Sequence, residues 1–310
     1  MRFPIRYFKA KTSINFMRWR WVWFSISIVS ITCIVLLLLT KGLNYGIDFT
    51  GGILMEVRTE KEMSLAPFRK ALEKENFGEV ALQNFGERRN ILIRIQTKAN
   101  TDQAKTVERA KDIVKQVASE SVEFRKIDYV GPTVGKELLK SGILASGLAL
   151  GAIMVYLWFR FEWQYGLGGL LALIHDAIFV IGFYAVSGFD FGLTAVAAIL
   201  TIIGYSINDS VVIYDRIREN MRKYKQMGLS ELINLSINET LSRTILTATT
   251  TLLAAIVLLV FGGDVIRGFS AALVFGIAIG TYSSIYISAP ILIYFGRAQL
   301  LRQETVKAAG

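Results

Sequence analysis

Six apolar runs, each about as long as a lipid bilayer is thick, limit the possible folds of this chain more than any other feature. They cover residues 21–39, 143–159, 166–186, 192–213, 245–261 and 269–295. A membrane-spanning helix needs roughly 20 mainly apolar residues. The chain is also 53% hydrophobic and only 19% charged, whereas an ordinary soluble domain is about 25% charged. The sequence therefore predicts an integral membrane protein with six helical spans.

Basic residues collect at the ends of these runs, and their placement predicts the orientation of the spans. Residues 1–20 contain six cations and no acid, so the positive-inside rule places the N-terminus in the cytoplasm. With six spans, the C-terminus also lies in the cytoplasm, and we expect a multi-pass protein of the cell (inner) membrane. Because the cations lie beside apolar runs, the net charge of +10 does not indicate nucleic-acid binding. The first run is too long for the core of a secretion signal and is interpreted as a retained span.

The predicted organisation follows from these two patterns. The cytoplasmic parts are a basic N-terminus (1–20), a segment between spans four and five (215–243) and a tail (296–310). The predicted spans are 21–39, 140–159, 165–186, 191–214, 244–262 and 269–295. One extracytoplasmic domain, residues 42–136, separates the first span from the second.

Residues 42–136 alternate between the period of a strand and the period of a helix. Strands are predicted at 53–59, 79–85, 90–97 and 122–130, helices at 64–76 and 101–119, and a connection at 86–89. The order βαββαβ is that of a ferredoxin-like unit. The predicted fold class is therefore α-helical membrane protein, six spans, with one α+β ferredoxin-like extracytoplasmic domain. That fold supports many functions and supplies no chemistry by itself.

The fourth span contains the strongest candidate for chemistry inside the membrane, Asp209. Asp209 precedes Asp215 by six residues, which places it about 9 Å inside the cytoplasmic end of the helix. A charged side chain in a span costs roughly 2.5–3.5 kcal/mol on insertion scales and so needs an explanation. Asp209 either relays protons or hydrogen-bonds across helices, and the residues alone leave both open. Ser206 and Asn208 lie near it on the same span.

Two further groups of polar residues lie in or beside predicted spans. His175 and Asp176 are near the centre of the third span, where they either lock two helices together or take part in a relay; the first alternative is slightly favoured. Arg243 begins the fifth span, followed by a stripe of threonines that includes Thr247. Arg243 is either an interfacial cation or a partner of Asp209, and threonine hydroxyls also bond back to their own helix.

Small residues recur at four-residue spacing in two spans, a pattern typical of close helix packing in membranes. They are Gly147 and Gly151 in the second span, and Ala272, Gly276, Gly280, Ser284 and Ser288 in the sixth. One cysteine and one histidine exclude a disulfide framework and a Cys/His metal cluster. No catalytic constellation faces water, so we expect neither an enzyme nor a bound cofactor.

Several motifs in order resemble the SecD/SecF family of bacterial protein-export membrane proteins, in the resistance-nodulation-division superfamily. The segment 46–52 is similar to the first family signature, with Gly46, Asp48, Phe49, Gly51 and Gly52 as its defining residues. The other matching segments are 130–135, 159–163, 175–176, 204–220, 243–244 and 280–286. Each is weak alone, but their order and placement together are specific.

The resemblance implies a six-span half of a twelve-span unit whose other half is SecD. It implies work beside the SecY, SecE and SecG channel, with YajC and YidC as further partners, on exported polypeptides. Protons would be the coupling ion, Asp209 the proton-binding carboxylate and Arg243 its functional partner. The runner-up function is a half-size proton-driven exporter of lipids or small molecules, and a third is a membrane scaffold without ion coupling.

Overall fold

The computed structural model describes residues 12–75, 77–85, 87–96, 103–118 and 122–295. The chain forms two compact units. One consists of residues 44–145 with 190–196, and the other of residues 1–43, 146–189 and 197–310. The first unit contains the sheet and the second contains most of the apolar helices, so each is described by itself.

Six helices in the described part of the chain are long and apolar enough to cross a membrane. They are α1 Arg20–Thr40, α5 Pro132–Arg160, α6 Trp163–Ser187, α7 Leu193–Lys223, α8 Leu229–Phe261 and α9 Arg267–Ser283. A short 3₁₀ turn, η1 Phe16–Trp19, precedes α1, and η2 Asp264–Ile266 precedes α9. The sixth span continues beyond α9 to Phe295. The protein is therefore a multi-pass helical membrane protein.

The six helices differ in how much of their apolar surface the chain itself covers. About half of the most apolar window is buried in α6 and α9, and 44% in α7, but only 6% in α1 and α5 and 11% in α8. Side chains such as Leu148 on α5 and Val260 on α8 are almost two-thirds exposed. In a bilayer such faces contact lipid or another protein.

The helices α7 and α8 extend far into the predicted cytoplasmic segment 215–243. Only residues 224–228 separate them. Ion pairs favour this extension, since Arg216 bonds both Glu219, one turn along α7, and Glu239 on α8. Charge pairs at this spacing stabilise helices in water.

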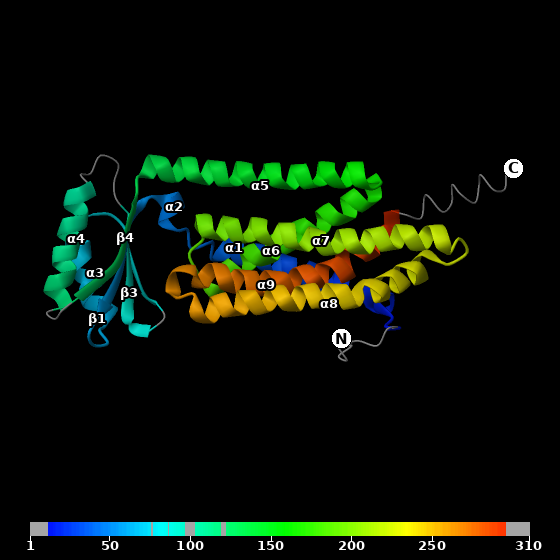
Figure 1. Ribbon diagram of the computed structural model, residues 1–310. Helices are drawn as coiled ribbons and strands as arrows, with labels where there is room; N and C mark the ends of the chain where they lie inside the picture. The colour runs from blue at the N-terminus through cyan, green and yellow to red at the C-terminus, as the bar shows by residue number, and fades with distance from the viewer. Residues whose placement is uncertain (1–11, 76, 86, 97–102, 119–121, 296–310) are drawn as a thin grey trace, which may run out of the picture. The chain divides into compact units, whose positions relative to one another are not determined.

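The other unit contains a four-stranded antiparallel sheet, a small domain that follows the first span. Its strands are β1 Gly52–Thr59, β2 Val80–Phe85, β3 Glu87–Ile95 and β4 Val122–Val130, arranged in the order β2-β3-β1-β4. Helices α3 Leu65–Lys74 and α4 Gln103–Ala118 lie on one face of this sheet (Figure 1). Alternate residues of β1 and β3 point into the core between sheet and helices: Ile53, Met55, Val57, Ile91, Ile93 and Ile95.

Two details of this domain differ from the sequence prediction. The connection predicted at 86–89 is wrong, because β3 already begins at Glu87 and pairs with Phe85. Antiparallel strands can be joined by a very short turn, so the pairing extends to Glu87. A one-turn helix, α2 Ile47–Thr50, was not predicted. The predicted ends at residues 76, 97, 101 and 119 lie outside the described residues.

Candidate functional site

Asp209 lies on α7 with only 3% of its surface exposed. Among the described residues, its Oδ2 atom has no hydrogen-bond partner. A buried carboxylate oxygen without a partner is costly, and such a group in a native protein calls for a functional or solvent explanation. The carboxylate therefore has free capacity for a proton or a water molecule.

Two residues of α8 lie close enough to affect the Asp209 carboxylate: Thr244 through its hydroxyl and Arg243 through its charge. Thr244 is the first residue of the predicted fifth span, and Arg243 directly precedes it. The Thr244 hydroxyl is buried and also has no partner at hydrogen-bond geometry among the described residues. Arg243 is exposed. One turn before Asp209 on α7, the buried hydroxyl oxygen of Tyr205 is likewise without such a partner. Asp209 and Tyr205 on α7 and Thr244 on α8 thus each carry a buried polar atom without a partner at hydrogen-bond geometry in the described part of the chain.

Asp176 on α6 lies in the opposite situation. It is completely buried, and its Oδ2 atom accepts hydrogen bonds from Ser206 Oγ on α7 at 2.5 Å and from Ser283 Oγ on α9 at 2.8 Å. Its Oδ1 atom lies 2.9 Å from Nδ1 of the neighbouring His175. Both carboxylate oxygens are therefore occupied, and the three inner helices meet at this one side chain.

The hydrogen-bond network continues from His175 to α1. Its Nε2 atom lies 3.1 Å from Ser27 Oγ, which is 2.8 Å from the hydroxyl of Tyr282 on α9. Tyr282 in turn donates to the carbonyl oxygen of Trp23. Hydrogen bonds thus connect this pair to α1, α7 and α9, and its role as a lock between helices stays a prediction.

Directly after Ser283, the sixth span changes to a π-helical turn, η3 Ser284–Ser288. The Oγ atoms of Ser284 and Ser210 are 3.1 Å apart, and Ser288 donates to the buried hydroxyl of Tyr214. Such π-turns are frequent at functional sites. Sequence reasoning missed this turn; the only signal was the row of serines, which was interpreted as packing.

Three other polar residues singled out from the sequence either bond to groups other than Asp209 or face outward. Ser206 belongs to the Asp176 cluster. Asn208 is exposed on α7. Thr247 donates to the carbonyl oxygen of Arg243 four residues earlier. Its hydroxyl therefore bonds back to its own helix. Thr244 contributes the relevant hydroxyl instead.

The glycine-rich motif at 46–52 joins segments of the sheet-containing unit. The Asp48 carboxylate accepts a hydrogen bond of 2.8 Å from the backbone N–H of Leu193, the first residue of α7. A carboxylate at this position stabilises a helix N-terminus. Gly46 N–H donates to the Phe191 carbonyl oxygen, and the rings of Phe49 and Phe191 are 6.1 Å apart. The motif therefore anchors the start of the helix that bears Asp209.

The last two glycines of the motif are required by backbone conformation and space. Gly51 and Gly52 have φ angles of 73° and 120°, which side chains disfavour. A Cβ atom at Gly51 would lie 2.8 Å from the Cα atom of Pro132, and one at Gly52 would collide with the carbonyl oxygen of Ile95. Beside the motif, Arg94 bonds both Asn44 and Asp190.

Comparison with known proteins identifies the family that the motifs resemble. The family model "Protein export membrane protein SecD/SecF, C-terminal" matches residues 109–298, and "SecD/SecF GG Motif" matches residues 36–63. The chain belongs to the SecD/SecF family.

Its relatives in that family include proteins of known name. The protein translocase subunit SecF of Rickettsia bellii is 49% identical over 94% of this chain and 97% of its own length, and that of Rickettsia prowazekii is 46% identical over 99% of both. The crystal structure of SecDF, a translocon-associated membrane protein from Thermus thermophilus, superposes with a TM-score of 0.85 at 34% identity. It covers 96% of this chain, which spans 40% of the SecDF chain.

Membership of the SecD/SecF family makes the chain an accessory subunit of Sec protein translocation. The family is one of translocase subunits and is not named for any catalytic activity. The translocase names of the relatives also favour protein export over the runner-up, a half-size exporter of lipids or small molecules.

Proposed function

We propose that this chain, as one half of a SecD–SecF unit, uses the proton gradient to promote export of unfolded polypeptides through the SecY channel. The observation that carries the proposal is the buried Asp209 carboxylate, whose Oδ2 atom has no partner among the described residues. That oxygen can accept and release a proton without first breaking a hydrogen bond of its own. Arg243, with Thr244, acts on it from α8 and sets its affinity for the proton.

SecD is the proposed obligate partner. The SecDF structure that resembles this chain is more than twice its length, and α1, α5 and α8 leave most of their apolar surface uncovered by this chain. Gly147 and Gly151 on α5 have no atom within 4 Å of a Cβ position, so this row is free for close contact with another helix. SecY, SecE and SecG, with YajC and YidC, are the further partners proposed, and protons are the only coupling ligand.

The proposed topology places both termini in the cytoplasm and the sheet domain outside. Residues 42–136 are proposed to be a ferredoxin-like domain, which the strand order β2-β3-β1-β4 and the two helices on one face support. In this proposal the domain moves as Asp209 gains and loses its proton. The Asp48 bond to the first residue of α7 gives a route for that coupling.

The test is export into inverted membrane vesicles that contain equal amounts of each variant, with and without a proton gradient. Asp209→Asn preserves shape and removes the titrating group, so the gradient-dependent part of export should disappear. Asp215→Asn on the same helix is the matched control, because that exposed carboxylate already pairs with Arg160. It should keep gradient-dependent export.

Two measurements show whether a loss of gradient-dependent export in the Asp209→Asn variant comes from the missing titrating group or from a damaged fold. Membrane insertion and copurification of SecD should be unchanged, since a neutral amide relieves the desolvation cost of a buried charge. Undiminished gradient-dependent export by Asp209→Asn would contradict the proton-carrier role and favour the scaffold alternative.

A further inference from the structure

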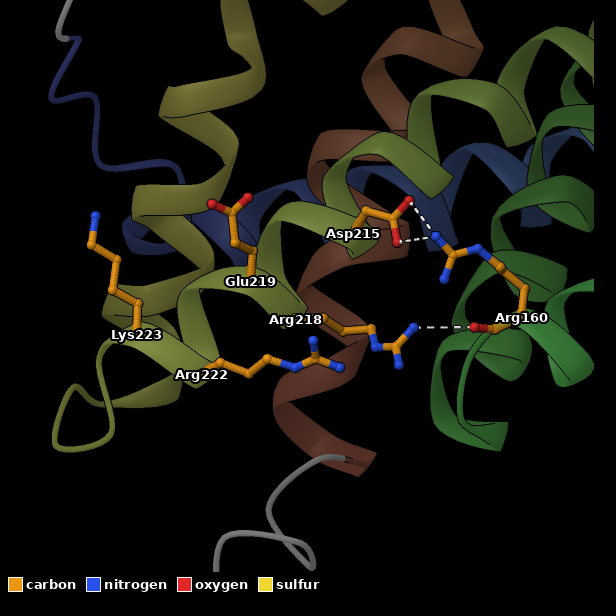
Figure 2. Close-up of a pocket in the computed structure, with 6 residues that line it drawn as sticks. All are labelled: Arg160, Asp215, Arg218, Glu219, Arg222 and Lys223. Carbon is orange, nitrogen blue, oxygen red and sulfur yellow. Dashed lines mark hydrogen bonds and ion pairs between the residues drawn. The ribbon is translucent and has the colours of Figure 1, made fainter.

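A basic pocket of about 460 Å³ lies between the end of α5 and the last turns of α7 (Figure 2). Its lining residues are Arg160, Asp215, Arg218, Glu219, Arg222 and Lys223. Four of these are cations and two are acids. The pocket lies away from Asp209 and has no part in the proposed proton chemistry.

Both acids of the pocket are already paired. Arg160 Nη2 donates to both oxygens of the Asp215 carboxylate, at 2.9 and 3.1 Å. Glu219 accepts a hydrogen bond of 2.6 Å from Arg216, which does not line the pocket. Arg218, Arg222 and Lys223 have no carboxylate at ion-pair distance among the described residues, so three positive charges of the pocket remain uncompensated.

The uncompensated guanidinium groups lie together. Arg218 and Arg222 are one helical turn apart and extend in the same direction from α7, whereas the Lys223 side chain points elsewhere (Figure 2). Like charges at this spacing destabilise a helix. Arg218 is also held in place, because it donates to the Arg160 carbonyl oxygen and its guanidinium lies 5.4 Å from the centroid of the Phe161 ring. An anion between the two groups would remove their repulsion.

The pocket begins at the height of the lipid headgroups, which add roughly 5–8 Å on each side of the hydrocarbon core. At 1.5 Å per residue, Arg218 lies about 6 Å beyond the predicted end of the fourth span at residue 214, within that layer. Arg222 lies about 12 Å beyond it, just outside the layer, and its long side chain extends in the same direction as that of Arg218 (Figure 2). Beside the pocket, Trp158 and Phe159 at the end of α5 are 62% and 89% exposed, as interfacial aromatic residues are in membrane proteins.

We propose that this pocket binds the phosphate of an anionic phospholipid, with Arg218 and Arg222 as its charged ligands. A planar guanidinium donates two parallel hydrogen bonds to a phosphate, and basic pockets between spans on the cytoplasmic side are suited to anionic headgroups. The exposed aromatic side chains favour a phosphate that carries acyl chains over a free one. In the topology proposed above, this end of the helices is cytoplasmic.

The test uses the full chain purified in a neutral detergent and titrated with short-chain phosphatidylglycerol, with bound lipid counted by native mass spectrometry. Phosphatidylcholine of equal chain length and inorganic phosphate are the parallel probes. The double variant Arg218→Gln/Arg222→Gln should bind phosphatidylglycerol about tenfold more weakly or worse, since each cation near an anionic headgroup contributes appreciably. The matched control is Lys136→Gln/Lys140→Gln, which removes two exposed cations at the opposite end of α5 and should bind normally.

Further variants keep the test decisive if the double variant folds poorly. Arg222→Gln alone changes an exposed side chain and should still weaken binding about threefold, whereas Arg218→Lys/Arg222→Lys should retain most of it. Equal phosphatidylglycerol binding by wild type and Arg222→Gln would overturn the proposal. Equal affinity for phosphatidylcholine would also overturn it, and displacement of the lipid by an equal concentration of inorganic phosphate would show a free-phosphate site instead.

Discussion

Two buried carboxylates on neighbouring helices differ in almost every contact they make. Asp176 on α6 is contacted by two serine hydroxyls and a histidine ring from three helices. Asp209 on α7 leaves an oxygen without a partner in the described structure and lies near Thr244, whose hydroxyl is equally unpartnered. Both are almost fully buried, so burial alone does not distinguish them.

The difference indicates which acid can change its protonation state at little cost to the fold. Protonating or removing Asp176 disturbs bonds that connect α6, α7 and α9, whereas Asp209 has few bonds to lose. We therefore assign a structural role to Asp176, whose oxygens are all hydrogen-bonded, and a switching role to Asp209, which has an oxygen without a partner in the described structure.

The largest expected effect is on stability. Asp176→Ala should lower the free energy of unfolding by about 3 kcal/mol or more, because buried donors left without an acceptor cost about 1–3 kcal/mol each. Asp209→Ala should cost much less. Thermal unfolding of both purified variants in the same detergent measures the difference, and equal losses would contradict the proposed division of roles.

Arg243 should matter for function more than for folding. Arg243→Ala is expected to abolish most gradient-dependent export in vesicles, because it removes the cation that acts on Asp209. Arg243→Lys keeps the charge without the rigid donor fork and should retain part of the activity. If the alanine variant exports normally, Arg243 is only an interfacial cation.

The two hydroxyls beside the carboxylates offer a subtler comparison. Ser206→Ala deletes a bond to Asp176 and should lower stability by about 1.5–3 kcal/mol, as expected for a hydrogen bond to a charged group. Thr244→Val replaces an unpartnered buried hydroxyl by a group of the same shape, so stability should stay within about 0.5 kcal/mol while gradient-dependent export falls. Denaturation and vesicle export are measured on both variants. A loss of stability in Thr244→Val together with a loss of export in Ser206→Ala would exchange the roles of the two sites.

The smallest effect concerns an acid in water, Glu108 on α4. A hydrogen bond from Lys111 holds the pKa of Glu108 below its ordinary value of 4.5. A lowered pKa stabilises the fold above the unfolded-state value, and this contribution is lost as the pH falls through the folded-state value. Wild type should therefore unfold slightly later than Glu108→Gln at pH 7, and the difference should vanish near pH 3. A difference that persists in acid would point to another cause.

The sequence predicted the parts of this protein that depend on local pattern. Helices of bilayer length follow from apolar runs, because backbone polar groups in lipid must bond within their own segment. The helix predicted at 64–76 is present as α3, which Ser64 caps by accepting a hydrogen bond from the Ala66 N–H. Asp209 stood out as a candidate because an acid in an apolar run is costly wherever it points.

Contacts between segments far apart in the chain could be decided only by the tertiary structure. Ser206 and Ser283 lie 30 and 107 residues from the carboxylate that they bond, and no sequence period connects them. The row of small residues in the sixth span packs inside the chain, where Gly276 faces Ile202 and Gly280 faces Ser206, whereas the row in α5 remains open. Local sequence specifies which groups are costly to bury, but the packing of helices determines which of them find partners.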